Sequence, residues 1–416
     1  MGGWARPDDA DDEDEYVRTS RTVIGVIIAL TILAACSSDD DGAEVRLLAG
    51  GGDDIDGTGA DAALPYSITR LSSGGDGTLW GVTGTGVMVR IDSGGVVRST
   101  QLQLGSGMVH EIAAAPDGTV YVLLDQAGQE AGEAAVLEFA DGELRPAVGV
   151  PAGEPEGPGP VTPDGEPAAE AELGHVGDIA VDSEGRLLFT EQADPAGADA
   201  GYLLRRVEAD GTLVTVAGRP NPGYDGNLTD DESAAAFFPD GTPAADLTLF
   251  SESAIAAGPG EQVVVQTTQS VYAVADGSAT TVLGAAGGGE IPPATDGPFG
   301  ASAAATSIDY QPGFPQLSLA VNAEGGIVAS TGALSGFDAD AFRWRVEDGS
   351  DRAQAVADAA AGDQQTAHPT LYVTPGGDAM VAAVFGGPAT WLDDDTVAVG
   401  ATGEDDQIIV MIDVED

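Results

Sequence analysis

Three short phrases recur in fixed order along this 416-residue chain, and this repetition limits the folds available to it. The first is an apolar strand, a turn and a second strand, with copies beginning at Ile68, Ile112, Ile179, Ile255, Leu319 and Leu371. The second is a strand ending in a turn, as in "YLLRRVEADG", "AVLEFADG", "VYAVADG", "FRWRVEDG" and "MVRIDSGG". The third is a strand ending in glycine, as in "LVTVAG", "TTVLG" and "EVRLLAG". Asp-Gly and Glu-Gly between β-rich runs indicate tight turns, because glycine accepts positive φ.

About four short strands per repeat with little helical periodicity predict an all-β chain folded as a β-propeller. Counting first strands predicts six four-stranded blades. The phrases "TWLDDDTVAVG" and "QIIVMIDVE" leave a seventh, abbreviated blade as the alternative. The N-terminal "EVRLLAG" is a fourth strand with nothing before it. We therefore expect it to pair in the last blade, which closes the ring and removes an exposed sheet edge.

One more phrase separates each fourth strand from the next copy. It reads "DGTGADAAL" from Asp56, "DGEPAAEAEL" from Asp164, "DGTPAADLTL" from Asp240 and "DGPFGASAAA" from Asp296. With "TVAG" before it and "IAVD" after it, this pattern resembles the NHL repeat, particularly the long-linker type of bacterial exported proteins and teneurins. The resemblance covers most of residues 43–416 and is most specific in "GDIAVDSEGRLLFTE…LLRRVEADGTLVTVAG". It implies a propeller of four-stranded blades around a central channel.

The single cysteine, Cys36, follows an apolar run at 23–35 that Arg18 and Arg21 precede. A helix needs about 20 apolar residues to span a bilayer, so this shorter run matches the h-region of a signal peptide. The run closes on "LAAC" at residues 33–36, which resembles the lipobox of bacterial lipoproteins. The resemblance implies cleavage before Cys36 and acylation of its thiol. The alternative is a short anchor or core helix with an incidental thiol.

The expected organisation is therefore an acidic segment plus lipoprotein signal peptide at 1–35, a lipidated polar tether at 36–42 and the propeller at 43–416. The acidic "DDADDEDE" departs from the basic start of most signal peptides. A start codon placed too far upstream, or a small cytoplasmic tail, would account for it. This organisation predicts a protein anchored to the cell membrane through Cys36 and facing the extracytoplasmic side.

Acidic residues number 69 against 15 basic residues, all of them arginine, for a net charge of −54. Such a chain repels nucleic acid and anionic membrane surfaces. Hydrophobic residues still make up 43%, enough to bury a core. Acid spread over the whole length suggests a surface adapted to high salt, where the Debye length falls to about 3 Å at 1 M. A coding bias toward Gly, Ala, Asp and Val is the alternative.

The candidate site residues are the three histidines, His110, His175 and His368, each shortly before an expected first strand. In a propeller such positions converge on one mouth of the channel, where imidazoles can hold a zinc-like ion. NHL-like peptidyl-amidoglycolate lyases are similar in placing three histidines on a metal at their axis. Surface or hydrogen-bonding histidines are the other interpretation. The Asp spacing of residues 53–61 faintly resembles a calcium loop but lacks the Glu at its twelfth position.

The sequence contains no nucleophile elbow, phosphate-binding loop or His-Glu-Xaa-Xaa-His motif, and no catalytic residue is assigned. Arg205, Arg206, Arg343 and Arg345 fall on expected third strands, where we predict pairs with carboxylates. Tyr202, Trp344 and Trp391 are predicted to pack between blades. Two functions follow: a non-enzymatic scaffold that binds an extracellular protein, peptide or glycan without a cofactor, and alternatively a metal-dependent lyase or lactonase using the histidines.

Overall fold

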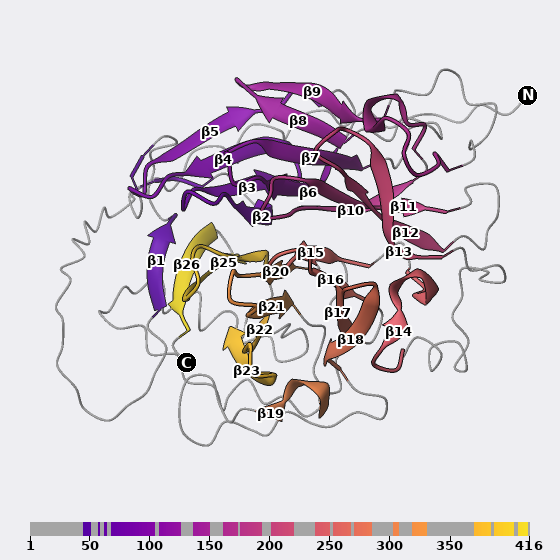
Figure 1. Cartoon of the computed structure of the whole chain (residues 1–416). Coiled ribbons are helices and arrows are strands. Elements are labelled where there is room, and N and C mark those ends of the chain that lie inside the picture. Colours follow the sequence, from indigo (N-terminus) through magenta and orange to yellow (C-terminus); the bar gives the residue numbers. More distant parts are fainter. Residues whose placement is uncertain are drawn as a thin grey trace, which may run out of the picture. The chain divides into compact units, whose positions relative to one another are not determined.

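The computed structural model shows an all-β chain whose sheets form a six-bladed β-propeller (Figure 1). Each blade is an antiparallel sheet with its first strand nearest the axis. This confirms the predicted fold class and blade number. The structure describes residues 45–50, 57–58, 62–64, 68–104, 108–125, 136–149, 161–173, 175–193, 201–219, 238–249, 253–267, 270–284, 303–307, 318–330, 370–383, 387–402 and 407–414. Among these residues no helix is long and apolar enough to cross a membrane.

The first three blades follow the repeat phrases directly. Blade one contains β2 (Ile68–Ser73), β3 (Leu79–Thr83), β4 (Val87–Ile91) and β5 (Val97–Gln101). Blade two contains β6 (Met108–Ala114), β7 (Val120–Asp125), β8 (Val136–Ala140) and β9 (Glu143–Val148). Blade three contains β10 (Val176–Val181), β11 (Leu187–Gln192), β12 (Tyr202–Val207) and β13 (Leu213–Gly218).

The other blades have the same order, and two of them gain a short fifth strand at the outer edge. Blade four contains β15 (Ile255–Ala257), β16 (Val263–Gln266), β17 (Val271–Ala275) and β18 (Ser278–Leu283), with β14 (Thr242–Pro243) outside. Blade five contains β20 (Leu319–Val321), β21 (Ile327–Ser330), β22 (Thr370–Val373) and β23 (Asp378–Ala383), with β19 (Ala303–Ala304) outside. Blade six contains β24 (Ala389–Trp391), β25 (Thr396–Thr402), β26 (Gln407–Asp413) and β1 (Val45–Ala49).

The ring is closed by β1, as predicted. Figure 1 shows the indigo β1 beside the yellow β26, and their register pairs Val45 with Ile412. Arg46 adds an ion pair to Asp413 at 2.8 Å. Ala49 is fully buried in the cluster between blades six and one. The N-terminal strand therefore joins the two ends of the chain and covers the edge of β26 as the fourth strand of blade six.

The predicted position of one strand in the order of the blades was wrong. Leu371 was expected to open the sixth blade, but it lies in β22, the third strand of blade five. The phrases considered as a seventh blade are blade six itself. A third and fourth strand joined by a Gly-containing turn have the same apolar pattern as a first and second, and residues 331–369 separate β21 from β22. The predicted strand "FRWRVEDG", with Arg343, Trp344 and Arg345, lies outside the described residues.

The hydrophobic core is divided into six clusters, one between each pair of neighbouring sheets. Two predicted packing residues belong to it. Tyr202 is 6% exposed between blades three and four, and Trp391 is 4% exposed between blades five and six. Burying one such side chain contributes roughly 1.5–3 kcal/mol, so each blade depends on both of its neighbours.

The Asp-Gly phrase between blades runs along the outer edge of the blade that follows it. Three such linkers contain one 3₁₀ turn each, η2 (Ala168–Glu170), η3 (Ala244–Asp246) and η4 (Ala305–Ser307). Asp164 accepts a hydrogen bond from the hydroxyl of Thr215 in β13, and Asp240 accepts one from the backbone of Thr281 in β18, both at 2.8 Å. These aspartates therefore cover strand edges that would otherwise be open.

Glycine ends the fourth strand because the chain turns sharply there. Gly50, Gly149, Gly218 and Gly284 all have φ between 83° and 101°. At Gly218 a Cβ atom would also lie 2.4 Å from the carbonyl oxygen of Tyr202. Only glycine combines this dihedral with such a close approach. A glycine is therefore needed at the point where the chain leaves the outer strand of a blade, which explains why it recurs there.

Candidate functional site

The inner strands of all six blades line a central channel of about 130 Å³. Its charged side chains come from blades one to three, namely Arg70, Glu111 and Asp178. The remaining blades contribute small, aliphatic or hydroxyl side chains, such as Ala254, Ser318 and Thr390. The charged groups of the channel therefore lie on one side only.

The channel charges link neighbouring blades. Arg70 Nε lies 2.8 Å from Glu111 Oε2, which joins blade one to blade two. The two carboxylate oxygens of Asp178 accept backbone N–H groups, Oδ1 from Ile179 at 2.8 Å and Oδ2 from Ile255 of blade four at 2.7 Å. Inner strands of different blades do not pair with one another in the described sheets. These side chains supply polar contacts between the inner strands of neighbouring blades instead.

Burial raises the pKa of Asp178 well above its ordinary value, and the negative charge of Glu111 raises it further. Burial also raises the pKa of Glu111, although the Arg70 guanidinium opposes this effect. The channel has one guanidinium for two carboxylates. Because this leaves an excess of negative charge, the pair of carboxylates favours retention of a proton. A volume of about 130 Å³ holds only a few waters at ~30 Å³ each. The charged groups of the channel therefore hold neighbouring blades together, and the channel is too small for an organic ligand.

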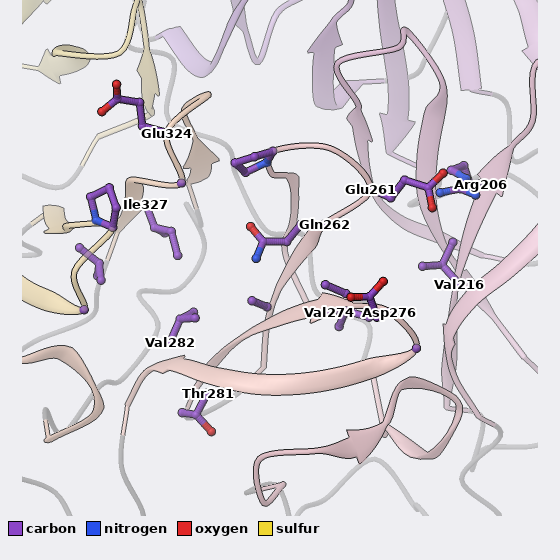
Figure 2. Close-up of a pocket in the computed structure, with 18 of the residues that line it drawn as sticks. Arg206, Val216, Glu261, Gln262, Val274, Asp276, Thr281, Val282, Glu324 and Ile327 are labelled. Atoms are coloured by element: carbon purple, nitrogen blue, oxygen red, sulfur yellow. The ribbon is translucent and has the colours of Figure 1, made fainter.

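A much larger concavity lies over blades three, four and five, and we call it the groove. It encloses about 940 Å³ at the face where first strands turn into second strands and third strands turn into fourth. Figure 2 shows Gln262 between Ile327 on one side and Val216 and Arg206 on the other. Aliphatic lining side chains are Val214, Val216, Val274, Val282, Ile327 and Val373. The groove thus combines an apolar lining with polar turns.

Ion pairs organise the blade-three wall of the groove. Arg206 donates from Nε and Nη2 to the same oxygen of Glu208, at 2.8 and 2.6 Å. Behind this pair Arg186 is 9% exposed, and its Nη1 lies 3.6 Å from both Glu208 and Glu261. Glu261 belongs to blade four, so Arg186 also ties the two blades together. This wall is rigid and partly charge-compensated.

The other polar turns present exposed carboxylates. Asp276 lies in the β17–β18 turn with φ 50°, and Glu324 lies in the β20–β21 turn. Asn322 Oδ1 accepts the N–H groups of Glu324 and Gly326 at 3.2 and 2.6 Å, which fixes that turn. In the described part of the chain neither Asp276 nor Glu324 has an ion-pair partner. The groove therefore carries the carboxylates of Glu208, Glu261, Asp276 and Glu324 against the guanidinium of Arg206.

The predicted histidine site is only partly described. His110 lies within β6 rather than before it, and His175 directly precedes β10. His175 Nδ1 is 3.0 Å from the hydroxyl of Tyr202. His368 lies outside the described residues, and the strand after it is the third of blade five, so the expected placement before a first strand was wrong. Among described residues no group of three His, Cys, Asp or Glu side chains is placed to hold a metal.

Other sequence predictions have mixed outcomes. Arg205 and Arg206 do pair with carboxylates, as predicted. Cys36 and most of the calcium-like stretch 53–61 lie outside the described residues. The groove itself was not predicted. Its residues belong to the turn phrases "VEADG", "VADG" and "NAEGG", which indicated turns but not which turns face one another.

No protein-family model matches this sequence, and no curated protein matches it. Solved structures similar to it include an auxiliary nutrient binding protein from Bacteroides thetaiotaomicron, with 10% identity, TM-score 0.48, and 89% of this chain and 76% of that chain covered. A calcium-binding regucalcin from Agrobacterium tumefaciens has 10% identity, TM-score 0.43, and 91% and 98% coverage. Virginiamycin B lyase from Staphylococcus aureus has 10% identity, TM-score 0.40, and 90% and 100% coverage. The propeller assignment rests on the sheets described above.

Proposed function

We propose that this chain is an extracytoplasmic, lipid-anchored propeller that binds a protein, peptide or glycan ligand non-enzymatically in the groove. The observation that carries this proposal is the groove's volume of about 940 Å³, against about 130 Å³ for the channel. Ligand sites usually enclose about 300–1,000 Å³ and combine apolar walls with a few placed polar groups. The groove has both properties, and the channel is below this range.

The lining chemistry supports recognition. Gln262 supplies an amide donor and acceptor, and Thr281 and Thr306 supply hydroxyl groups. The half-buried Val214, Val216 and Val282 of blades three and four supply apolar contact area, whereas Val274, Ile327 and Val373 belong to the buried core at its base. Because the supporting turns are held by ion pairs and side-chain hydrogen bonds, little order has to be gained when a ligand binds. Six packed blades thus present a preorganised surface.

A groove-filling variant tests this function. Val282 is half-buried in β18 and lines the groove, so Val282→Trp should fill part of it. Ala147 in β9 is the matched control, because it stands two residues before the final glycine of blade two as Val282 does in blade four. The purified chain is screened against displayed peptides, extracellular proteins and glycans. We expect selected ligands to bind the parent and Ala147→Trp but not Val282→Trp. Ligands that bind all three equally would contradict a site in the groove.

A further inference from the structure

We infer that the groove binds a cationic polypeptide segment with aliphatic side chains, and that the groove face of the propeller is turned toward the membrane. This inference rests on the proposed function and narrows its ligand. Charge complementarity is the first reason. The carboxylates of Glu208, Glu261, Asp276 and Glu324 outnumber the single guanidinium of Arg206, which is already engaged by Glu208. A lysine or arginine side chain would find carboxylates on turns of all three blades that line the groove, while an acidic ligand would be repelled.

The two groove carboxylates without an ion-pair partner among the described residues come from different blades. Asp276 belongs to blade four and Glu324 to blade five, and both are exposed at turns. Figure 2 shows Gln262 and aliphatic side chains in the space around them. A ligand that reaches both needs cationic groups separated by apolar ones. An extended peptide of alternating lysine and valine presents its cationic side chains on one side and its aliphatic side chains on the other, because successive side chains point in opposite directions.

The groove's apolar surface further favours a peptide over a sugar. Its described lining contains aliphatic side chains and no tryptophan, tyrosine or phenylalanine. Sugar rings are usually held against aromatic faces, whereas valine and isoleucine pack against aliphatic side chains. The main-chain groups of a peptide can also bond to the Gln262 amide, which has both a donor and an acceptor.

The start of β1 lies on the same face of the propeller as the groove. Val45 at the start of β1 pairs with Ile412 near the end of β26, so the chain enters blade six where third strands meet fourth strands. The groove lies on that same face, and Asn322 bonds to the carbonyl of Asp394 there at 2.7 Å. Cys36 precedes Val45 by nine residues, which span at most about 30 Å when extended. A lipid on Cys36 would therefore hold the start of β1, which lies on the groove face, within about 30 Å of the bilayer.

Charge-neutralising variants with matched controls test the ligand class. Asp276→Asn and Glu324→Gln remove two groove carboxylates. Asp141→Asn and Asp117→Asn remove exposed carboxylates from the two corresponding turns of blade two, outside the groove. The probe is a labelled peptide of alternating lysine and valine, and glutamate replaces lysine in its control. We expect the double groove variant to weaken lysine-peptide binding about tenfold in 0.15 M salt, and the double control variant to weaken it less than about twofold.

The outcomes separate this inference from the proposed function. Equal weakening by both double variants would show non-specific attraction to an acidic chain and overturn the inference. Binding of a neutral glycan or the glutamate peptide that Val282→Trp abolishes would also overturn it, while leaving the groove as the binding site. If Val282→Trp blocks no ligand, the proposed function itself fails.

Orientation is tested on the lipid-anchored chain in vesicles. A donor dye is attached at Glu261→Cys, which is 73% exposed on the groove face, or at Thr85→Cys, an exposed turn residue between β3 and β4 on the opposite face. The acceptor is a headgroup-labelled lipid. We expect stronger energy transfer from Glu261→Cys. Stronger transfer from Thr85→Cys would overturn the membrane-facing part of the inference.

Discussion

Arg205 offers a direct test of how blade three is held, because it is fully buried despite its charge. Nη1 lies 3.0 Å from Glu191, which is also fully buried, and Nη2 donates to the carbonyl of Thr162 at 2.9 Å. Nη2 also lies 3.3 Å from Asp164, which is half exposed in the linker before the blade. The perturbation is a cycle of Arg205→Met, Glu191→Leu and the double variant.

The structure predicts unequal costs. Arg205→Met removes all three contacts and leaves the Glu191 carboxylate buried without its guanidinium, so it should cost about 3–5 kcal/mol. Glu191→Leu leaves Arg205 with Asp164 and the Thr162 carbonyl, so its cost should be about 1–3 kcal/mol. The double variant replaces a buried pair by apolar groups, which is often neutral or favourable. It should therefore be more stable than Arg205→Met alone.

The assay is urea unfolding followed by tryptophan fluorescence, at one fixed chloride concentration because the chain is strongly acidic. Comparable m-values across the cycle are required before the free energies of unfolding are compared. We expect a coupling energy of about 1–3 kcal/mol. Strictly additive costs, or a Glu191→Leu variant less stable than Arg205→Met, would refute the account of this pair.

Four other predictions follow from the anchor, the closure, the charge and the histidines. Cys36→Ser should abolish labelling by a palmitate analogue and leave the protein released or uncleaved; retained label would exclude the lipobox. Deleting residues 45–49 should lower the melting temperature of the whole propeller, because β1 closes blade six, and a parent-like melt would contradict this role. The melting temperature should rise steadily from 0.01 to 1 M sodium chloride as repulsion among carboxylates is screened, whereas a flat profile would favour coding bias. Metal analysis of the purified chain should show no stoichiometric zinc-like ion, and bound metal that His175→Ala removes would favour the lyase or lactonase alternative.

Most of the fold could be predicted from the sequence, because local turn chemistry and strand pattern repeat together. The Asp-Gly turns, the terminal glycines and the β1 closure all appear as predicted. The error at Leu371 has a physical origin: every hairpin of a blade has the same apolar alternation, so pattern alone does not number the strands. Even spacing between successive strands would have shown which strand of the blade each one is. Residues 331–369 interrupt the repeat within blade five.

The groove was not predictable in the same way, since it depends on which turns lie side by side. Glu261 and Arg186 are 75 residues apart in sequence, and Glu324 is further still, yet all three belong to turns on one face. Arg186 is an example of a residue whose sequence neighbours reveal only some of its contacts. Its ion pairs with Asp182 and Glu184 are local in sequence, but its contacts with Glu208 and Glu261 follow only from blade packing.

The same turn positions also carry acidic residues outside the groove. Asp141 matches Asp276 in conformation, with φ 54° and 50°, and Glu184 matches Glu324 in its Asx-type turn. Composition therefore explains why these residues are acidic, and blade packing explains why only some of them face a shared concavity. Stability of the fold and binding of a cationic peptide should respond to salt in opposite directions. Chloride should stabilise the fold by relieving repulsion over the whole surface, while it weakens attraction between groove carboxylates and a cationic peptide. A chain that melts higher and binds its peptide less tightly in the same titration would show both effects in one molecule.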